Sequence, residues 1–183
     1  MKRLFDIVAS GCGLIILSPL FLILAVWIKF DSKGPVFYRQ VRVGRGNKNF
    51  RIFKFRSMRI GADKGSLVTI GGRDPRVTRS GYYIRKYKFD ELPQLINVFI
   101  GDMSLVGPRA YMPNERQEIG PHGDIILRIR PGLTGWWQVM GRHLTLFHER
   151  LMLDAYYIKN WSLWLDAFIL IKTIKVILKG EGA

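Results

Sequence analysis

The first part of the chain is dominated by one long apolar stretch. Residues 7–28 contain no charged side chain over 22 positions. As a helix rising 1.5 Å per residue they would reach about 33 Å, enough for a bilayer core of about 30 Å. Leu, Ile and Phe occupy every face of that helix, which favours lipid over a buried core. A signal peptide fits less well, because the run exceeds the usual apolar region and no small-residue cleavage site follows it.

A Ser18-Pro19 pair lies near the middle of this stretch. Proline removes a backbone hydrogen bond and clashes with the preceding turn, so we predict a bend there. Basic residues flank the stretch on both sides, at Lys2, Arg3 and Lys29. Positive charge at both ends favours a helix hairpin that enters and leaves by the cytoplasmic face, although a straight span with its N-terminus outside stays open.

The pattern changes to strands after the apolar stretch. Residues 36–42 and 50–58 are rich in aromatic and β-branched side chains and flank the turn-forming segment 44–49, which predicts a β-hairpin. In the second strand, Lys54 and Arg56 alternate with aromatic residues. Such a pattern is typical of single-stranded nucleic-acid sites and of acidic membrane surfaces, and the neighbouring apolar stretch favours the membrane.

Helical spacing returns in two later regions. The apolar positions of a predicted short helix lie three and four apart: Leu92, Leu95, Ile96 and Phe99. Gly101 is expected to end it. Residues 151–178 read as two helices broken near Asn160 and Trp161, the last with apolar and lysine positions typical of a membrane interface. Together these elements predict an α+β fold that is mainly helical, with a small β-hairpin.

The charge of the chain is large and unevenly placed. The 183 residues carry a formal net charge of +15, and between Lys29 and Lys88 there are 17 Lys and Arg against three acidic residues. Such a field attracts nucleic acid, anionic lipid headgroups or phosphorylated small molecules, and composition does not choose among them. Cys12 is the single cysteine, which excludes an intrachain disulfide, and the three histidines lack metal-ligand spacing with it.

Two adjacent carboxylates, Asp90 and Glu91, stand at the start of the predicted short helix. Helix capping alone would explain them, because an Asp at the cap and a Pro in the first turn are start signals. Unpaired N–H groups and the helix dipole also stabilise a carboxylate, which makes Asp90 a candidate nucleophile. Arg85, Lys86 and Lys88 precede it, and we expect these cations to hold its pKa down and to bind phosphate.

Two glycine-rich segments show no periodicity. Residues 61–80 carry Gly, Asp-Pro and Ser turn signals and predict a long surface loop, either solvated or a substrate lid. Residues 128–142 combine Pro-Gly and Thr-Gly turns with Trp136 and Trp137. A glycine-rich loop beside an arginine can hold a phosphate, and a structural turn with buried tryptophans explains the segment as well.

Several strings resemble one known family, the bacterial sugar transferases that act as monotopic phosphoglycosyl transferases on polyprenyl phosphate. They span nearly the whole chain: KRLFDI, the Ser-Pro pair, GPVFYRQVRVG, KFRSM, DELPQLINV, GDMSLVGPR, RPGLTG, QVMGR and NWSLWLD. One departure is Ala110, where the family usually has a proline after the arginine that matches Arg109. The extra membrane-spanning and regulatory region of larger members has no counterpart here, which implies the minimal catalytic form.

The resemblance implies transfer of a sugar-1-phosphate from a UDP-sugar to polyprenyl (undecaprenyl) phosphate, with release of UMP, at the cytoplasmic face of the bacterial inner membrane. Family members use an Asp-Glu dyad and Mg²⁺. Carried over, Asp90 would attack the phosphorus nearest the sugar and form a covalent intermediate, while Glu91 supports the dyad and both hold the metal. The resemblance also implies a monotopic protein, with a re-entrant membrane helix over residues 1–30 and a cytoplasmic catalytic domain with interfacial helices over 31–183.

The expected substrate-binding residues are Lys54, Arg56, Arg85, Arg109, Arg130, Thr134 and Gln138. Arg109 is the expected phosphate clamp, and the last three are candidates for the nucleotide. Anionic membrane lipid is a further expected partner, nucleic acid is not, and a homodimer stays open.

Two other functions remain open. One is a basic membrane-bound module that binds lipid or nucleic acid without catalysis, and the other is a structural membrane scaffold. In either case Asp90 and Glu91 would be dispensable. The sequence leaves the sugar undecided among galactose, glucose and acetylated amino sugars.

Overall fold

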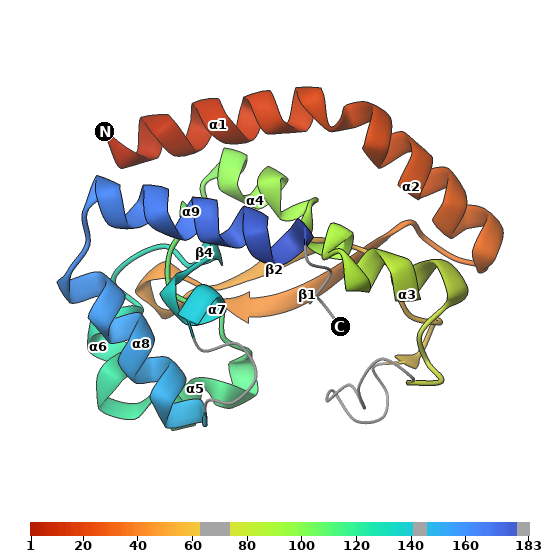
Figure 1. Cartoon of the computed structure of the whole chain (residues 1–183). Coiled ribbons are helices and arrows are strands. Elements are labelled where there is room, and N and C mark those ends of the chain that lie inside the picture. Colours follow the sequence, from red (N-terminus) through yellow and green to blue (C-terminus); the bar gives the residue numbers. More distant parts are fainter. Residues whose placement is uncertain (63–73, 141–145, 179–183) are drawn as a thin grey trace.

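The computed structural model describes residues 1–62, 74–140 and 146–178. Over these ranges the fold is mainly helical with two small sheets, which confirms the predicted α+β class (Figure 1). The longer helices are α1 (Lys2–Ile16), α2 (Ser18–Asp31), α3 (Arg79–Lys86), α4 (Gln94–Ile100), α8 (Phe147–Lys159) and α9 (Leu163–Leu178). The shorter ones are α5 (Arg116–Ile119), α6 (Gly123–Ile126) and α7 (Trp136–Met140). Most of the predicted lid over residues 61–80 lies outside the described residues, as does His143.

The predicted break in the N-terminal apolar stretch is confirmed. Helices α1 and α2 meet at Leu17 with a bend of 59° and form one side of the molecule (Figure 1). Pro19 lies in the first turn of α2, where its missing N–H costs no helical hydrogen bond. Within the described ranges no single helix has the length and apolar character to cross a membrane, whereas the bent pair meets that test by length and composition.

Polar contacts tie α1 to distant parts of the chain. The Asp6 carboxylate, which is 3% exposed, accepts hydrogen bonds from Ser104 Oγ at 3.1 Å and from Leu105 N at 3.0 Å. Lys2 pairs with Asp166 of α9, and the Tyr157 hydroxyl donates to the same carboxylate at 2.6 Å. A buried carboxylate is tolerated when it is hydrogen-bonded, so these contacts fix the position of the helix.

The predicted β-hairpin is also confirmed. Strand β1 (Phe37–Val43) pairs antiparallel with β2 (Asn49–Phe55), and a 3-10 turn η1 (Arg45–Asn47) joins them. A second, parallel pair of β3 (Ser104–Val106) and β4 (Gly132–Thr134) was not predicted, because three residues are too few to show a period. Here the backbones approach so closely that a Cβ on Gly132 would lie 2.1 Å from the nitrogen of Gly107.

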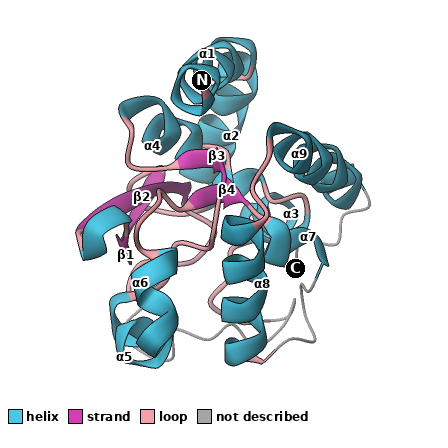
Figure 2. Ribbon diagram, turned by 90° about the vertical axis from the view of Figure 1, so that its left-hand side faces the viewer, coloured by secondary structure: helices cyan, strands magenta, loops and turns pink. Residues whose placement is uncertain are grey.

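The two sheets lie in the middle of the molecule, with α1 and α4 on one side and α5 and α6 on the other (Figure 2). The largest apolar cluster joins α4, β3, α8 and α9 through Val98, Met103, Tyr157 and Ile169. A separate cluster of Leu24, Ile28, Phe55 and Ile84 packs α2 and α3 on the hairpin. This core holds β2 and the segment before α4 in fixed positions, and the candidate site forms between them.

Candidate active site

Asp90 and Glu91 lie in a 3-10 turn, η4 (Phe89–Glu91), and not at the cap of α4 as predicted. Helix α4 begins at Gln94, after Pro93. The η4 turn is closed by three-residue hydrogen bonds, from Glu91 N to Lys88 O at 3.1 Å and from Leu92 N to Phe89 O at 3.2 Å. The capping interpretation of Asp90 is therefore wrong, and its carboxylate is left for other contacts.

Helix α4 is held against β2 by Asn97. Its Oδ1 accepts a hydrogen bond from Phe53 N, and its Nδ2 donates to Arg51 O, each at 2.9 Å. The buried face of α4 runs through Asn97 and Val98, whereas Phe99, predicted on the apolar face, is 46% exposed. The predicted stop at Gly101 is confirmed, with φ of 103°. The result is a fixed register between β2 and the η4 turn.

That register brings Lys54 of β2 to both carboxylates. Its Nζ lies 3.1 Å from Glu91 Oε1 and 3.9 Å from Asp90 Oδ2. The three side chains are partly buried, with 20% of Lys54, 34% of Glu91 and 14% of Asp90 exposed. A shared cation at these distances keeps two neighbouring carboxylates together, because it offsets their mutual repulsion.

The two carboxylates differ in proton affinity. Burial raises the pKa of Asp90, and the neighbouring Glu91 adds to this, although Lys54, Arg85 and Lys88 oppose it. Burial would also raise the pKa of Glu91, but the charges of Lys54 and Lys88 outweigh it and lower that pKa to about 2. The prediction that nearby cations lower the pKa of Asp90 is therefore wrong in its net sign, because burial is the larger effect.

A cavity of about 170 Å³ opens beside Glu91. It is lined by Arg42, Ile52, Lys54, Lys88, Glu91, Gln94, Arg109, Ala110, Gly132, Leu133, Trp137 and Gln138. We call it the Glu91 cavity. Its predicted members Lys54, Glu91, Arg109 and Gln138 are brought together from four separate segments. Clustered cations in a concave, partly dry site strengthen the local field, so the cavity attracts anions.

Arg42 and Arg109 supply guanidinium groups on one side of the Glu91 cavity. Arg42 donates from Nη1 to Ala110 O at 3.0 Å and from Nη2 to Gln40 Oε1 at 2.7 Å. Burial and the charge of Arg109 lower the pKa of Arg42 to about 10, so it stays charged at neutral pH. The Arg109 guanidinium lies 5.0 Å from the ring centre of Trp137. Both are therefore held in place before any ligand binds.

A buried carboxylate that the sequence analysis missed, Asp154 of α8, supports the Arg109 turn from behind. Its Oδ2 accepts hydrogen bonds from Arg109 N at 3.0 Å and from the Tyr111 hydroxyl at 2.7 Å. Burial raises the pKa of Asp154 to about 6, although both hydrogen bonds lower it. An acid within an apolar helix was the available signal, but nothing local shows that its partners lie more than 40 residues away.

The remaining predicted residues lie apart from the Glu91 cavity lining, except that the charge of Arg85, on α3, acts on Asp90. Arg56 donates to the carbonyls of Ser32 and Lys33 at 2.7 and 2.9 Å and so fixes the end of α2. Arg130 donates to Gly101 O at 2.7 Å, and Thr134 is buried against Thr173 at 2.7 Å. These three make structural contacts, and the structure does not bring them to the cavity.

The carboxylate pair fits the way proteins bind magnesium. Among the described residues, no group of three or more His, Cys, Asp or Glu side chains is arranged to hold a metal ion. Mg²⁺ does not require one, because it keeps several waters and is usually bound by one or two carboxylates together with substrate phosphate. Asp90 and Glu91 both reach the same Lys54 Nζ, and the low pKa of Glu91 keeps an anionic oxygen available. Magnesium binding by this pair stays a prediction.

A carboxylate pair beside a lysine, next to a cavity lined by further cations, is an arrangement suited to binding a phosphorylated compound. The chain belongs to the family described as bacterial sugar transferase, whose model matches residues 1–180. This match confirms the resemblance that the sequence strings indicated.

Three relatives illustrate the family. The undecaprenyl-phosphate galactose phosphotransferase of Salmonella typhimurium is 43% identical over 100% of this chain and 41% of its own length. The UDP-N-acetylgalactosamine-undecaprenyl-phosphate N-acetylgalactosaminephosphotransferase of Aeromonas hydrophila is 45% identical over 100% of this chain and 45% of its own. The exopolysaccharide production protein ExoY of Rhizobium meliloti is 38% identical over 100% and 87%. The chain thus spans less than half of the first two proteins.

Proposed function

We propose that the protein transfers a sugar-1-phosphate from a UDP-sugar to undecaprenyl phosphate and releases UMP, as a membrane step of polysaccharide or glycoconjugate synthesis. The observation that carries the proposal is the Asp90–Glu91 pair, held against Lys54 beside a cationic cavity. A module that merely binds lipid or nucleic acid has no need of two half-buried carboxylates at its most basic site. The names of the relatives supply the classes of donor and acceptor.

Asp90 is the proposed nucleophile. One of its carboxylate oxygens attacks the phosphorus nearest the sugar, the bond from that phosphorus to the bridging oxygen breaks, and UMP leaves with that oxygen. A phosphate oxygen of undecaprenyl phosphate then attacks the same phosphorus and releases the Asp90 carboxylate. Each step forms one P–O bond and breaks another, so charge and electrons balance without any redox partner.

The neighbours of Asp90 prepare this step. Burial raises the pKa of Asp90 overall, and Lys54, Arg85 and Lys88 oppose that rise and so favour the carboxylate form that attacks. Glu91 is ionised and holds Lys54 in position. Arg109, fixed over Trp137, is the proposed clamp for the diphosphate. Asp90 and Glu91 would hold Mg²⁺, which when bound supplies positive charge to the phosphate oxygens.

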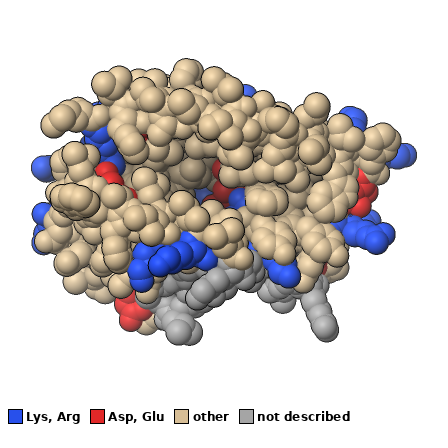
Figure 3. Space-filling model, turned by 45° about the horizontal axis from the view of Figure 1, so that its top comes forward, with Lys and Arg blue, Asp and Glu red and all other residues tan. Residues whose placement is uncertain are grey.

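We further propose that α1 and α2 enter the inner membrane from the cytoplasmic face as a re-entrant hairpin and that α9 lies at the interface. Large apolar side chains project from all three helices, with Ile15 of α1 76%, Phe30 of α2 88% and Trp164 of α9 87% exposed. In Figure 3 the upper part of the surface is mostly without charged side chains, Lys and Arg lie mainly at its ends and along its lower edge, and a hollow holds acidic and basic side chains. An acceptor lipid in the membrane would then meet the Glu91 cavity without leaving the bilayer surface.

The test is UMP release by Asp90→Asn in the presence of undecaprenyl phosphate and a panel of UDP-sugars. We expect a loss of at least about 1,000-fold, because the amide is not a nucleophile for phosphorus. Glu118→Gln, which neutralises an exposed carboxylate on α5, is the matched control and should keep normal turnover. When the reaction of the unsubstituted protein with a labelled UDP-sugar is quenched, the labelled phosphosugar should be found on Asp90. Normal turnover by Asp90→Asn, or label elsewhere, would overturn the covalent mechanism.

A further inference from the structure

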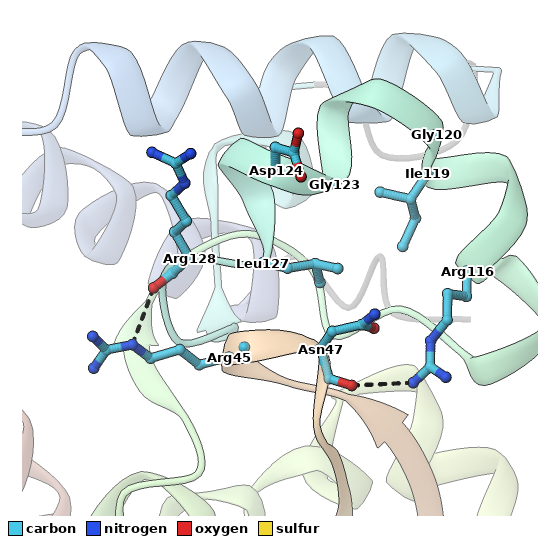
Figure 4. A pocket seen from close by; sticks show the side chains of 10 residues that line it. Arg45, Asn47, Arg116, Ile119, Gly120, Gly123, Asp124, Leu127 and Arg128 are labelled. Carbon is cyan, nitrogen blue, oxygen red and sulfur yellow. Dashed lines mark hydrogen bonds between the residues drawn. The ribbon is translucent and has the colours of Figure 1, made fainter.

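A second hollow, unrelated to the Glu91 cavity, lies between the hairpin turn η1 and the helices α5 and α6 (Figure 4). Its volume is about 420 Å³, within the range of small-molecule sites. It shares no lining residue with the Glu91 cavity. Arg45 and Arg128 stand on one side and Arg116 on the other, with the apolar side chains of Ile119 and Leu127 between them (Figure 4). We call it the arginine pocket.

The positive charge of the arginine pocket is poorly compensated. Arg45 Nε donates to Arg128 O at 3.0 Å, and Arg116 Nη2 donates to Asn49 Oδ1 at 2.8 Å, so both side chains are held by neutral acceptors. Asp124 also lines the pocket, yet within the described part of the chain no ion pair joins it to any of these arginines. Like charges around one hollow repel each other, and a bound anion removes that cost.

Arg116 provides a second, independent sign of a missing partner. Its Nε is buried, and among the described residues it has no hydrogen-bond acceptor. A buried donor on a charged group costs free energy when it stays unpaired, so such groups usually point to a bound water, ion or ligand.

We propose that the arginine pocket binds a small, soluble phosphorylated anion. Guanidinium groups match the oxygens of a phosphate with paired hydrogen bonds, which carboxylate and halide ions reproduce less well. Helices α5 and α6 lie on the opposite side of the molecule from α1 and α2 in both ribbon views (Figures 1 and 2), which argues for a ligand in solution over a lipid headgroup. The site is independent of the donor and acceptor positions proposed above.

The test is calorimetric titration of the full chain, in detergent, with inorganic pyrophosphate. Arg116→Gln and Arg45→Gln should each weaken binding at least about tenfold, since each removes a charged contact to phosphate. Arg39→Gln is the matched control, because it removes the same charge from an exposed position on the same hairpin. It should change the affinity less than twofold, and UMP release by Arg45→Gln without pyrophosphate should stay normal.

Lys54→Gln separates the two basic sites, since it disables the Glu91 cavity and leaves the arginine pocket intact. Pyrophosphate binding that survives in Lys54→Gln and is lost when Arg45→Gln is added to that variant supports the proposal. Binding that is lost in Lys54→Gln alone, or that falls equally in Arg39→Gln, overturns it. If Arg45→Gln binds anionic vesicles more weakly but keeps its affinity for pyrophosphate, the pocket binds lipid, and the proposal is overturned. Thermal unfolding of each variant excludes loss of fold as the cause.

Discussion

The Glu91 cavity and the arginine pocket are both basic, but they are built differently. In the Glu91 cavity the cations are braced: Lys54 by Glu91, Arg42 by Gln40 and the backbone, and Arg109 by Trp137. In the arginine pocket Arg45 and Arg116 are also held, by neutral oxygens. The difference is that the Glu91 cavity pairs one of its cations with carboxylates, whereas among the described residues no ion pair joins a carboxylate to the arginines of the pocket. Fixed charges of both signs are what catalysis requires, and a pocket that offers only cations can bind an anion but has little means of activating it.

The largest effect should follow from removing the carboxylate of Glu91. Glu91→Gln removes the charge that holds Lys54 at 3.1 Å and one of the two proposed magnesium ligands. We expect kcat/KM for UMP release to fall about 1,000-fold, equivalent to about 4 kcal/mol. Pyrophosphate binding at the arginine pocket should be unchanged. Loss of both UMP release and pyrophosphate binding would show that the two sites are not separate, and loss of neither would contradict the role of Glu91.

The next effect concerns the carboxylate behind Arg109. The pKa of Asp154 is about 6 in the folded protein, above the ordinary value of 3.8. Between pH 4 and 6 the unfolded chain therefore loses this proton before the folded one, and the free energy of unfolding falls as pH rises. The shift of about two pKa units corresponds to about 3 kcal/mol of lost stability by pH 7. Thermal unfolding from pH 4 to 8 measures it.

Asp154→Asn serves as the comparison for that measurement. The amide can still accept from Tyr111 and Arg109 but cannot ionise, so this contribution to the pH dependence should disappear while other groups titrate alike in both proteins. Parallel stability curves for the two proteins would contradict the assignment. Pyrophosphate binding at the arginine pocket, which Asp154 does not line, should be unchanged in Asp154→Asn.

The smallest effect is expected in the turn beside the arginine pocket. Gly46 adopts φ of 68°, and a Cβ there would meet no atom within 4 Å. Gly46→Ala should therefore cost about 1 kcal/mol through the left-handed backbone alone. Thermal unfolding should register this loss, while UMP release at 25 °C stays within twofold of normal. A large loss of turnover would mean that the turn and the Glu91 cavity are coupled.

Features set by neighbouring residues could be predicted from the sequence. The bend at Ser18-Pro19, the β-hairpin, the break before α9 and the stop at Gly101 each depend on local turn chemistry or periodicity. Lys54 was expected among the substrate-binding residues, and the structure places it in the Glu91 cavity and against both carboxylates.

Features set by distant packing could not be predicted. Arg42, Asp154 and the parallel β3–β4 pair reach the site through contacts between segments far apart in the chain. The sign of the Asp90 pKa shift depends on burial, which no local pattern reports. Arg56 stands two positions after Lys54, so alternation would place both on one face, but β2 ends at Phe55 and Arg56 turns to the carbonyls after α2.

The contact between Lys2 and Asp166 has a consequence for biogenesis. The ribosome makes the lysine 164 residues before the aspartate, so α1 emerges long before its electrostatic anchor on α9 exists. Until Asp166 has been made, Lys2 at the start of α1 lacks this partner. The contact between the start of α1 and α9 can therefore form only after Asp166 has been synthesised, later than the contacts of Asp6 with Ser104 and Leu105.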